Sequence, residues 1–186
     1  MLSFQNERDE IRWAFATLVD EKAGLCETLK ITKVTNADTY FGVLTKFSDQ
    51  LRDVTKALNE ETEMNLKNLS NRHRTRFDEY YEFGVPVAAR TSKGDWARAI
   101  ITEKIINSEV ISFEVLYVDS GILNIVTKED LSPISKKLVS RLPFQVIELK
   151  LKHVSPLDGW DEAALEVTQD LLNGESIQYQ VEVAVS

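Results

Sequence analysis

Hydrophobic and polar residues alternate with a period of two in several short segments, and we predict each of these segments to be a strand. Segments 29–34 and 40–44 are separated by Asn36-Ala37-Asp38, whose side chains favour a turn, so together they predict a hairpin. The later strands are predicted at Val85–Arg90, Ala97–Glu103, Ser112–Val118, Ile122–Val126, Gln145–Leu151 and Ile177–Val185, and Leu131-Ser132-Pro133 is predicted to close the group formed by the first four. The closely spaced strands between residues 85 and 133 indicate a small barrel.

Three other segments show the apolar period of an amphipathic helix. The first is Phe4–Lys22, and the second begins at Ser48 and extends toward Ser70. The third is Asp161–Leu172, which Trp160 precedes as a predicted core residue. The residues predicted to face inward are Leu51, Val54, Leu58 and either Met64 or Leu66 in the second helix, and Ala164, Leu165, Thr168, Leu171 and Leu172 in the third.

The order of these elements predicts how the chain is organised. Strands and a helix come first, then the compact barrel, and then strands and a helix again. The outer segments are too short to form separate stable domains. We therefore expect them to pair with each other around the inserted barrel.

Composition narrows the class of protein. The chain has 186 residues and a net charge of -8, with 30 acidic and 22 basic residues. This balance disfavours duplex binding, which relies on phosphate contacts, and favours a basic partner. The equally weighted alternative is that the acidic surface simply favours solubility. A single cysteine, Cys26, indicates a reducing compartment. Neither a membrane-spanning apolar run nor a signal-peptide pattern is found in the sequence.

An ordered series of motifs resembles the extended Tudor family. The barrel motifs are Val87-Ala88-Ala89-Arg90, Gly94-Asp95-Trp96-Ala97-Arg98-Ala99, Val115-Leu116-Tyr117-Val118-Asp119-Ser120-Gly121 and Glu129-Asp130-Leu131-Ser132-Pro133. The flanks, Ile31–Leu44, Leu142–Val146 and Ser155–Trp160, are similar to those of the family as well. The resemblance covers roughly residues 29–184.

The resemblance implies a mainly β fold with helices, of the α+β class. In this fold an SH3-like Tudor barrel is inserted in a split OB-type domain, similar to staphylococcal nuclease, and a long helix joins the two parts. The expected boundaries are 1–24 for an additional N-terminal helix, 29–47 and 140–186 for the split domain, 48–81 for the linker helix and 82–135 for the barrel.

Family barrels read methylated arginine through an aromatic cage, in which several ring faces surround a desolvated cation. The resemblance places the cage positions at Thr91, Ala97, Tyr117, Ser120 and, for the usual Asn, Ile122. Asn124 lies two positions further along, where a shifted loop can bring it near. Only Tyr117 keeps an aromatic ring, so the cage is predicted to be degenerate.

Four further positions are predicted to be structural. The resemblance implies that Arg98 and Asp119 form a charge pair on neighbouring barrel strands. Trp96 is predicted to pack in the barrel, and Gly121 occupies a turn that requires positive φ.

Catalysis is not expected. The nuclease-like part offers the carboxylate of Asp38 but no Asp/Arg constellation for phosphodiester cleavage. His73 and His153 are far apart, without a metal-ligand spacing, and the sequence has no Gly-rich phosphate loop. We predict neither a cofactor nor a metal.

The resemblance implies a scaffold module that binds an Argonaute/PIWI-class protein, or another small-RNA pathway protein, through a basic peptide. The expected location is cytoplasmic, in perinuclear germ granules (nuage) of the piRNA pathway. The N-terminal helix is a candidate for self-association. The alternatives are single-stranded RNA binding, with Tyr40, Phe41, Phe47, Lys33 and Lys46 as candidates, and a purely structural module of a larger scaffold.

Overall fold

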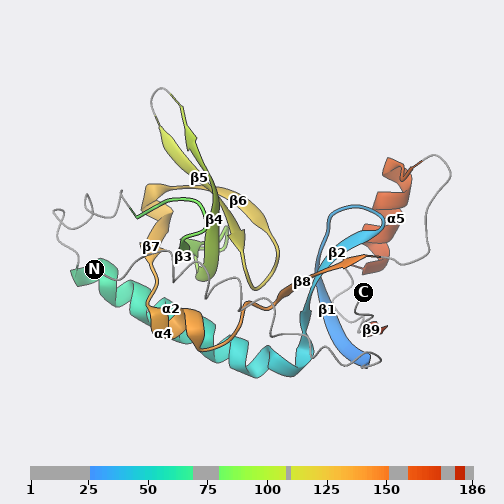
Figure 1. The fold of residues 1–186 in the computed structure, drawn as a ribbon, viewed down its shortest axis with the longest axis horizontal. Coiled ribbons are helices and arrows are strands. Elements are labelled where there is room, and N and C mark those ends of the chain that lie inside the picture. The colour runs from blue at the N-terminus through green and yellow to red at the C-terminus, as the bar shows by residue number, and fades with distance from the viewer. Residues whose placement is uncertain (1–25, 69–79, 108–109, 151–158, 173–178, 183–186) are drawn as a thin grey trace.

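The computed structural model describes residues 26–68, 80–107, 110–150, 159–172 and 179–182. In these residues two antiparallel sheets lie at opposite ends of the long axis, and one helix runs from one sheet to the other (Figure 1). The predicted N-terminal helix, His73 and His153 lie outside the described residues. None of the described helices is long and apolar enough to cross a membrane.

The first sheet has four strands in the order β8-β2-β1-β9. Its strands are β1 (Cys26–Val34), β2 (Thr39–Leu44), β8 (Val146–Lys150) and β9 (Tyr179–Glu182). Early and late parts of the chain therefore pair, as the order of elements predicted: β1 pairs with β9, and β2 pairs with β8. Leu29 and Leu44 form its buried centre, against which Phe47, Ile147 and Leu149 pack.

The second sheet has five strands in the order β6-β5-β4-β3-β7 and corresponds to the predicted barrel. The strands are β3 (Pro86–Arg90), β4 (Trp96–Ile106), β5 (Ile111–Tyr117), β6 (Leu123–Thr127) and β7 (Leu131–Pro133). The main core consists of Tyr81, which precedes β3, and the inward residues of the strands, Val87, Ala89, Ala99, Ile101, Phe113, Val115, Tyr117, Val126 and Leu131. A short 3-10 helix, η3 (Lys128–Asp130), connects β6 to β7.

The helix that joins the sheets is α2 (Ser48–Asn68), which follows the 3-10 helix η1 (Thr45–Phe47). Val54 and Leu58 are buried, as their spacing predicted. Of the two alternatives for the last inward position, Leu66 packs against the core, whereas Met64 is 63% exposed. Residues 69–79 of the predicted linker lie outside the described part of the chain.

A side chain of α2 attaches the helix to the barrel. The Asn59 Nδ2 group donates to Trp96 O at 2.9 Å, and Asn59 Oδ1 accepts from Trp96 N at 2.9 Å. The amide thus satisfies both backbone groups of Trp96, as a neighbouring strand would. Trp96 itself is buried against Leu58 and Leu138.

We expect Asn59→Ala to lower the free energy of unfolding by about 1–3 kcal/mol, because it leaves two partly buried backbone groups without partners. Chemical denaturation measures the change. Asn65→Ala removes an exposed amide from the same helix and serves as the control. Equal, small losses in both variants would contradict the attachment.

Helix α5 (Glu162–Leu172) packs against β1 less closely than predicted. Leu171 is 62% exposed and Trp160 is 36% exposed, so the predictions that they face the core are wrong. The helix has no fully buried side chain, and among the described strands it packs mainly against β1. A short helix, α4 (Lys136–Ser140), was not predicted, because five residues are too few to display a helical period.

Candidate functional site

The predicted cage positions lie where the β5–β6 turn meets the β3–β4 hairpin. Tyr117 ends β5 and is paired with Ala99 of β4. Its hydroxyl donates to Arg90 O at 2.6 Å, at the end of β3. One hydrogen bond therefore links the turn that contains Ser120 to the hairpin that contains Thr91 and Ala97.

Tyr117 is the only aromatic residue among these positions, and its side chain belongs to the barrel core. It is 5% exposed and packs with the buried residues of the five-stranded sheet. A cation–π contact requires a cation over the face of the ring. Here the ring is covered by protein and the hydroxyl is already bonded, so Tyr117 offers little free surface to a ligand.

The other positions carry no ring. Thr91 begins the β3–β4 turn, where its N–H donates to Asp95 O at 2.7 Å. Ala97 is half-buried and packs against the barrel core. Ile122 is 44% exposed, and its carbonyl accepts from Tyr117 N at 2.9 Å. These side chains have neither the π-surface nor the amide of a methylarginine cage.

Asn124 lies within β6, opposite Val115 in the β5–β6 register. Its Oδ1 accepts from the N–H of Ile125 at 3.0 Å. The β5–β6 register is regular from residue 112 to 116 and from 127 to 123, and it continues to the bond between Tyr117 and Ile122. The turn before β6 is therefore not shifted, and Asn124 stays two residues along the strand from the position where the family has its Asn.

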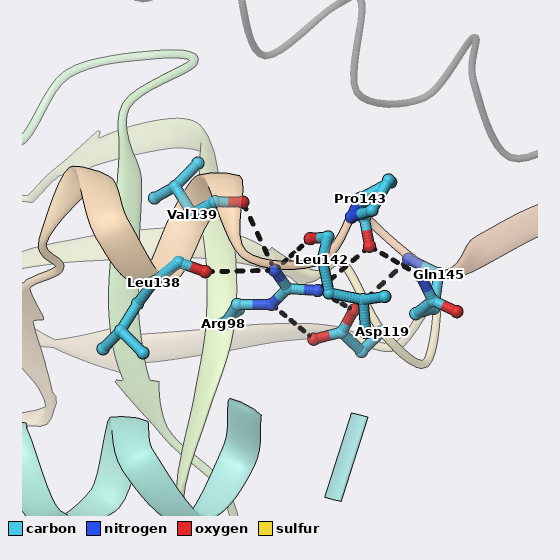
Figure 2. Close-up of polar contacts among 7 residues, drawn as sticks. All are labelled: Arg98, Asp119, Leu138, Val139, Leu142, Pro143 and Gln145. Atoms are coloured by element: carbon cyan, nitrogen blue, oxygen red, sulfur yellow. Dashed lines mark hydrogen bonds and ion pairs between the residues drawn. The ribbon is translucent and has the colours of Figure 1, made fainter. Parts of the chain in front are cut away.

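Arg98 and Asp119 form the main polar cluster beneath the site (Figure 2). Arg98 Nε donates to Asp119 Oδ2 at 2.9 Å, and its NH2 donates to Asp119 Oδ1 at 2.7 Å. The Arg98 side chain is 2% exposed and that of Asp119 is 15% exposed. A bidentate pair of this kind fixes the orientation of both groups.

The same guanidinium also binds the chain segment that leads to β8. Its NH1 donates to the carbonyls of Leu138, Val139 and Leu142, and its NH2 donates to that of Pro143, at 3.3, 3.5, 2.6 and 3.1 Å. Asp119 Oδ1 accepts in turn from Gln145 N at 3.2 Å. Arg98 therefore holds α4 and the connection between the two sheets against the barrel.

The β5–β6 turn contacts the four-stranded sheet directly. Thr32 Oγ1 of β1 donates to Ser120 O at 2.6 Å, and the N–H groups of Gln145 and Val146 donate to Val118 O at 3.1 and 3.0 Å. Gly121 has a φ of +73° and lies against Phe41. The site is thus placed at the junction of the two sheets.

Two features of the site were not predicted from the sequence. Thr32 is 88 residues from its partner Ser120, and no local pattern indicates that contact. Arg90 stacks on Trp96, with the guanidinium carbon 4.5 Å from the ring centroid, and lies 3.7 Å from Asp130. Arg90 follows a run of small residues before a tryptophan strand, and this spacing could have suggested the stack.

The residues named for RNA binding are mostly committed to packing. Tyr40 is 8% exposed, and its hydroxyl donates to Ala37 O at 2.5 Å. Phe47 packs on the centre of the four-stranded sheet, and Phe41 packs on Gly121. Stacking on bases requires exposed ring faces.

Within the described ranges, no three His, Cys, Asp or Glu side chains are grouped to hold a metal ion.

Comparison with known proteins identifies the family. The Tudor domain family model matches residues 27–153. Tudor domain-containing 6 of Danio rerio is 27% identical over 159 residues, which cover 83% of this chain and 7% of that protein. The chain thus spans a small part of the length of this relative.

Solved structures show the same architecture. The extended Tudor domain TD3 of mouse TDRD1, in complex with a MILI peptide containing dimethylarginine, is 22% identical with a TM-score of 0.73, covering 90% of this chain and 81% of that chain. A variant of the extended Tudor domain of Drosophila melanogaster Papi, in complex with an unmethylated Piwi N-terminal peptide, is 17% identical with a TM-score of 0.66, covering 80% and 70%. The chain belongs to the Tudor domain family and has the fold of an extended Tudor domain.

Proposed function

We propose that this chain is a non-catalytic scaffold module that binds the arginine-rich tail of an Argonaute/PIWI-class protein without discriminating methylated from unmodified arginine. The observation that carries the proposal is the state of the cage positions. Four of the five hold Thr91, Ala97, Ser120 and Ile122, and the fifth holds a tyrosine that is buried in the barrel. A methyl group therefore gains no aromatic surface on binding.

The binding free energy lost with the missing rings can be calculated approximately. A well-placed cation–π contact contributes about 0.5–2 kcal/mol, and three such contacts contribute several kcal/mol together. Methyl preference in a cage arises from these contacts, because the rings favour the more weakly hydrated cation. Without them, recognition rests on charge attraction and main-chain hydrogen bonds.

Two further observations support a basic peptide as the ligand. The net charge of -8 attracts a cationic tail. The Papi variant with the same fold is in complex with an unmethylated Piwi peptide, so the fold accommodates an unmodified arginine tail. By the same analogy we place the protein in the small-RNA pathway of germ granules.

Calorimetric titration of one Arg-Gly peptide, in unmodified and symmetrically dimethylated forms, tests the proposal. We expect dissociation constants that differ by less than about tenfold, which corresponds to less than 1.4 kcal/mol. A tenfold or greater preference for the methylated peptide would refute the proposal. Failure of both forms to bind would remove the basic tail as the ligand.

A variant with a rebuilt cage provides the matched control. Thr91→Phe, Ala97→Tyr, Ser120→Tyr and Ile122→Asn restore the expected residue types around Tyr117. If the missing rings are the cause, this variant prefers the methylated peptide while its affinity for the unmodified form stays similar. A wild-type chain and a rebuilt variant that both lack a preference would show that other features determine selectivity.

A further inference from the structure

The outer edge of β6 has no partner strand in the described part of the chain. β6 (Leu123–Thr127) is the last strand of the five-stranded sheet, and its described ladder is with β5 alone. An edge of this kind presents unpaired N–H and C=O groups to any strand that approaches it. Natural proteins usually protect such an edge with charges, a proline or a bulge.

The backbone of β6 directs alternate residues toward this edge. Tyr117 N donates to Ile122 O at 2.9 Å, so Ile122 and the residues of the same parity, Asn124 and Val126, form hydrogen bonds to β5. Leu123 and Ile125 then present their backbone groups to the open side. Among the described residues, the N–H of Ile125 donates to the neighbouring Asn124 Oδ1 at 3.0 Å, and a partner carbonyl can replace that contact.

The exposed side chains of β6 are uncharged, and two of the three are apolar. Leu123 is 46% exposed and Ile125 is 61% exposed, and they lie on the same outward face as the exposed Thr127. Residues 122–127 contain no charge, proline or glycine, in a chain in which 28% of residues are charged. Charge and proline are thus absent from this strand, and its register with β5 shows no bulge.

We propose that β6 pairs antiparallel with β6 of a second copy of this chain, about a two-fold axis at Ile125. A two-fold interface requires a surface that is complementary to itself. Centred on Ile125, the register sets Ile125 against its own copy, Leu123 against Thr127, and Asn124 against Val126. The first charge, that of Lys128, falls opposite Ile122, so no like charges meet.

The neutrality of the strand also selects this partner over a basic peptide. The arginine-rich tail of the proposed function needs acidic groups, and residues 122–127 supply none. A second neutral, β-branched strand meets no unpaired charge there and gains the open hydrogen bonds. The proposed pairing therefore does not depend on the proposed peptide binding.

Light scattering coupled to gel filtration tests the pairing on the full chain. We expect a concentration-dependent dimer at roughly 100 µM chain. Ile125→Lys places two ammonium groups opposite each other, so it should weaken association at least tenfold. Met64→Lys, at an equally exposed position on α2, should leave the dimer unchanged. A wild-type chain that is monomeric at this concentration would overturn the proposal.

A charge-reversal mixture tests the register and guards against simple misfolding. Ile125→Lys and Ile125→Glu should each be monomeric, while an equal mixture should form a heterodimer because position 125 faces itself. Thermal melting checks that each variant remains folded. A dimer that survives Ile125→Lys and disappears on deletion of residues 1–24 would place the contact in the N-terminal segment instead. A mixture that stays monomeric would exclude the register centred on Ile125.

Discussion

Arg98→Met is expected to lower the free energy of unfolding by about 3–5 kcal/mol. The substitution keeps much of the volume but removes the bidentate bonds to Asp119, whose carboxylate is 15% exposed. It also removes the donors to the carbonyls of Leu138, Val139, Leu142 and Pro143. Breaking one half of a buried pair is costly because the other charge stays buried without compensation.

Urea or guanidinium denaturation measures this loss. Arg52→Met is a matched control, since Arg52 pairs with Asp49 at 3.1 Å on α2 with side chains 76% and 87% exposed. Exposed pairs of this type contribute about 0–1 kcal/mol. Adding Asp119→Asn to Arg98→Met should recover part of the loss, because it removes the uncompensated charge. A loss for Arg98→Met no larger than that for Arg52→Met would contradict the role of the cluster.

Gly121→Ala is expected to lower the free energy of unfolding by about 2–4 kcal/mol. A non-glycine residue at φ +73° costs about 1 kcal/mol. The added Cβ would also lie 2.6 Å from Phe41 Cγ and 2.8 Å from Val146 Cγ2. The turn must then move away from the four-stranded sheet, which weakens the junction of the two sheets.

Gly94→Ala is a control that carries the backbone strain without the steric contact. Gly94 has a φ of +90°, and a Cβ added there would have nothing within 4 Å, so only the strain applies. We expect Gly121→Ala to be the more destabilising variant by about 1–3 kcal/mol. Phe41→Ala in the Gly121→Ala background should reduce the difference. Equal losses in the two glycine variants would show that the turn is not held tightly against β2.

Most elements of the fold could be predicted from local patterns. Most strands and helices α2 and α5 repeat an apolar period over enough residues to be recognised, and the motifs in the barrel carry the resemblance to the family. The residues at which strands begin and end were harder to predict. β1 begins at Cys26 because residues 26–29 pair with β9, and β4 extends to Ile106 because it pairs with β5 beyond a bulge.

The residue types at the site could be predicted from the sequence, but the contacts that these residues make could not. The sequence shows which cage positions lack a ring, but not that the Tyr117 ring is buried or that its hydroxyl is bonded to Arg90 O. The Asn59 and Thr32 contacts bridge 37 and 88 residues, and such distances leave no periodic signal. The prediction for Trp160 was wrong: a large aromatic residue is usually mostly buried, but Trp160 is 36% exposed just before α5, and no sequence pattern distinguishes the two cases.

The split of the four-stranded sheet has a consequence for synthesis on the ribosome. The strands of the inserted barrel are contiguous in the sequence, so it can begin to fold once residue 133 has emerged. The hairpin of β1 and β2 is made first, yet both of its sides stay open until β8 and β9 are translated. Between the two sheets, the one whose first strands are translated earlier is therefore completed later, and chaperones have the longer time to act on it.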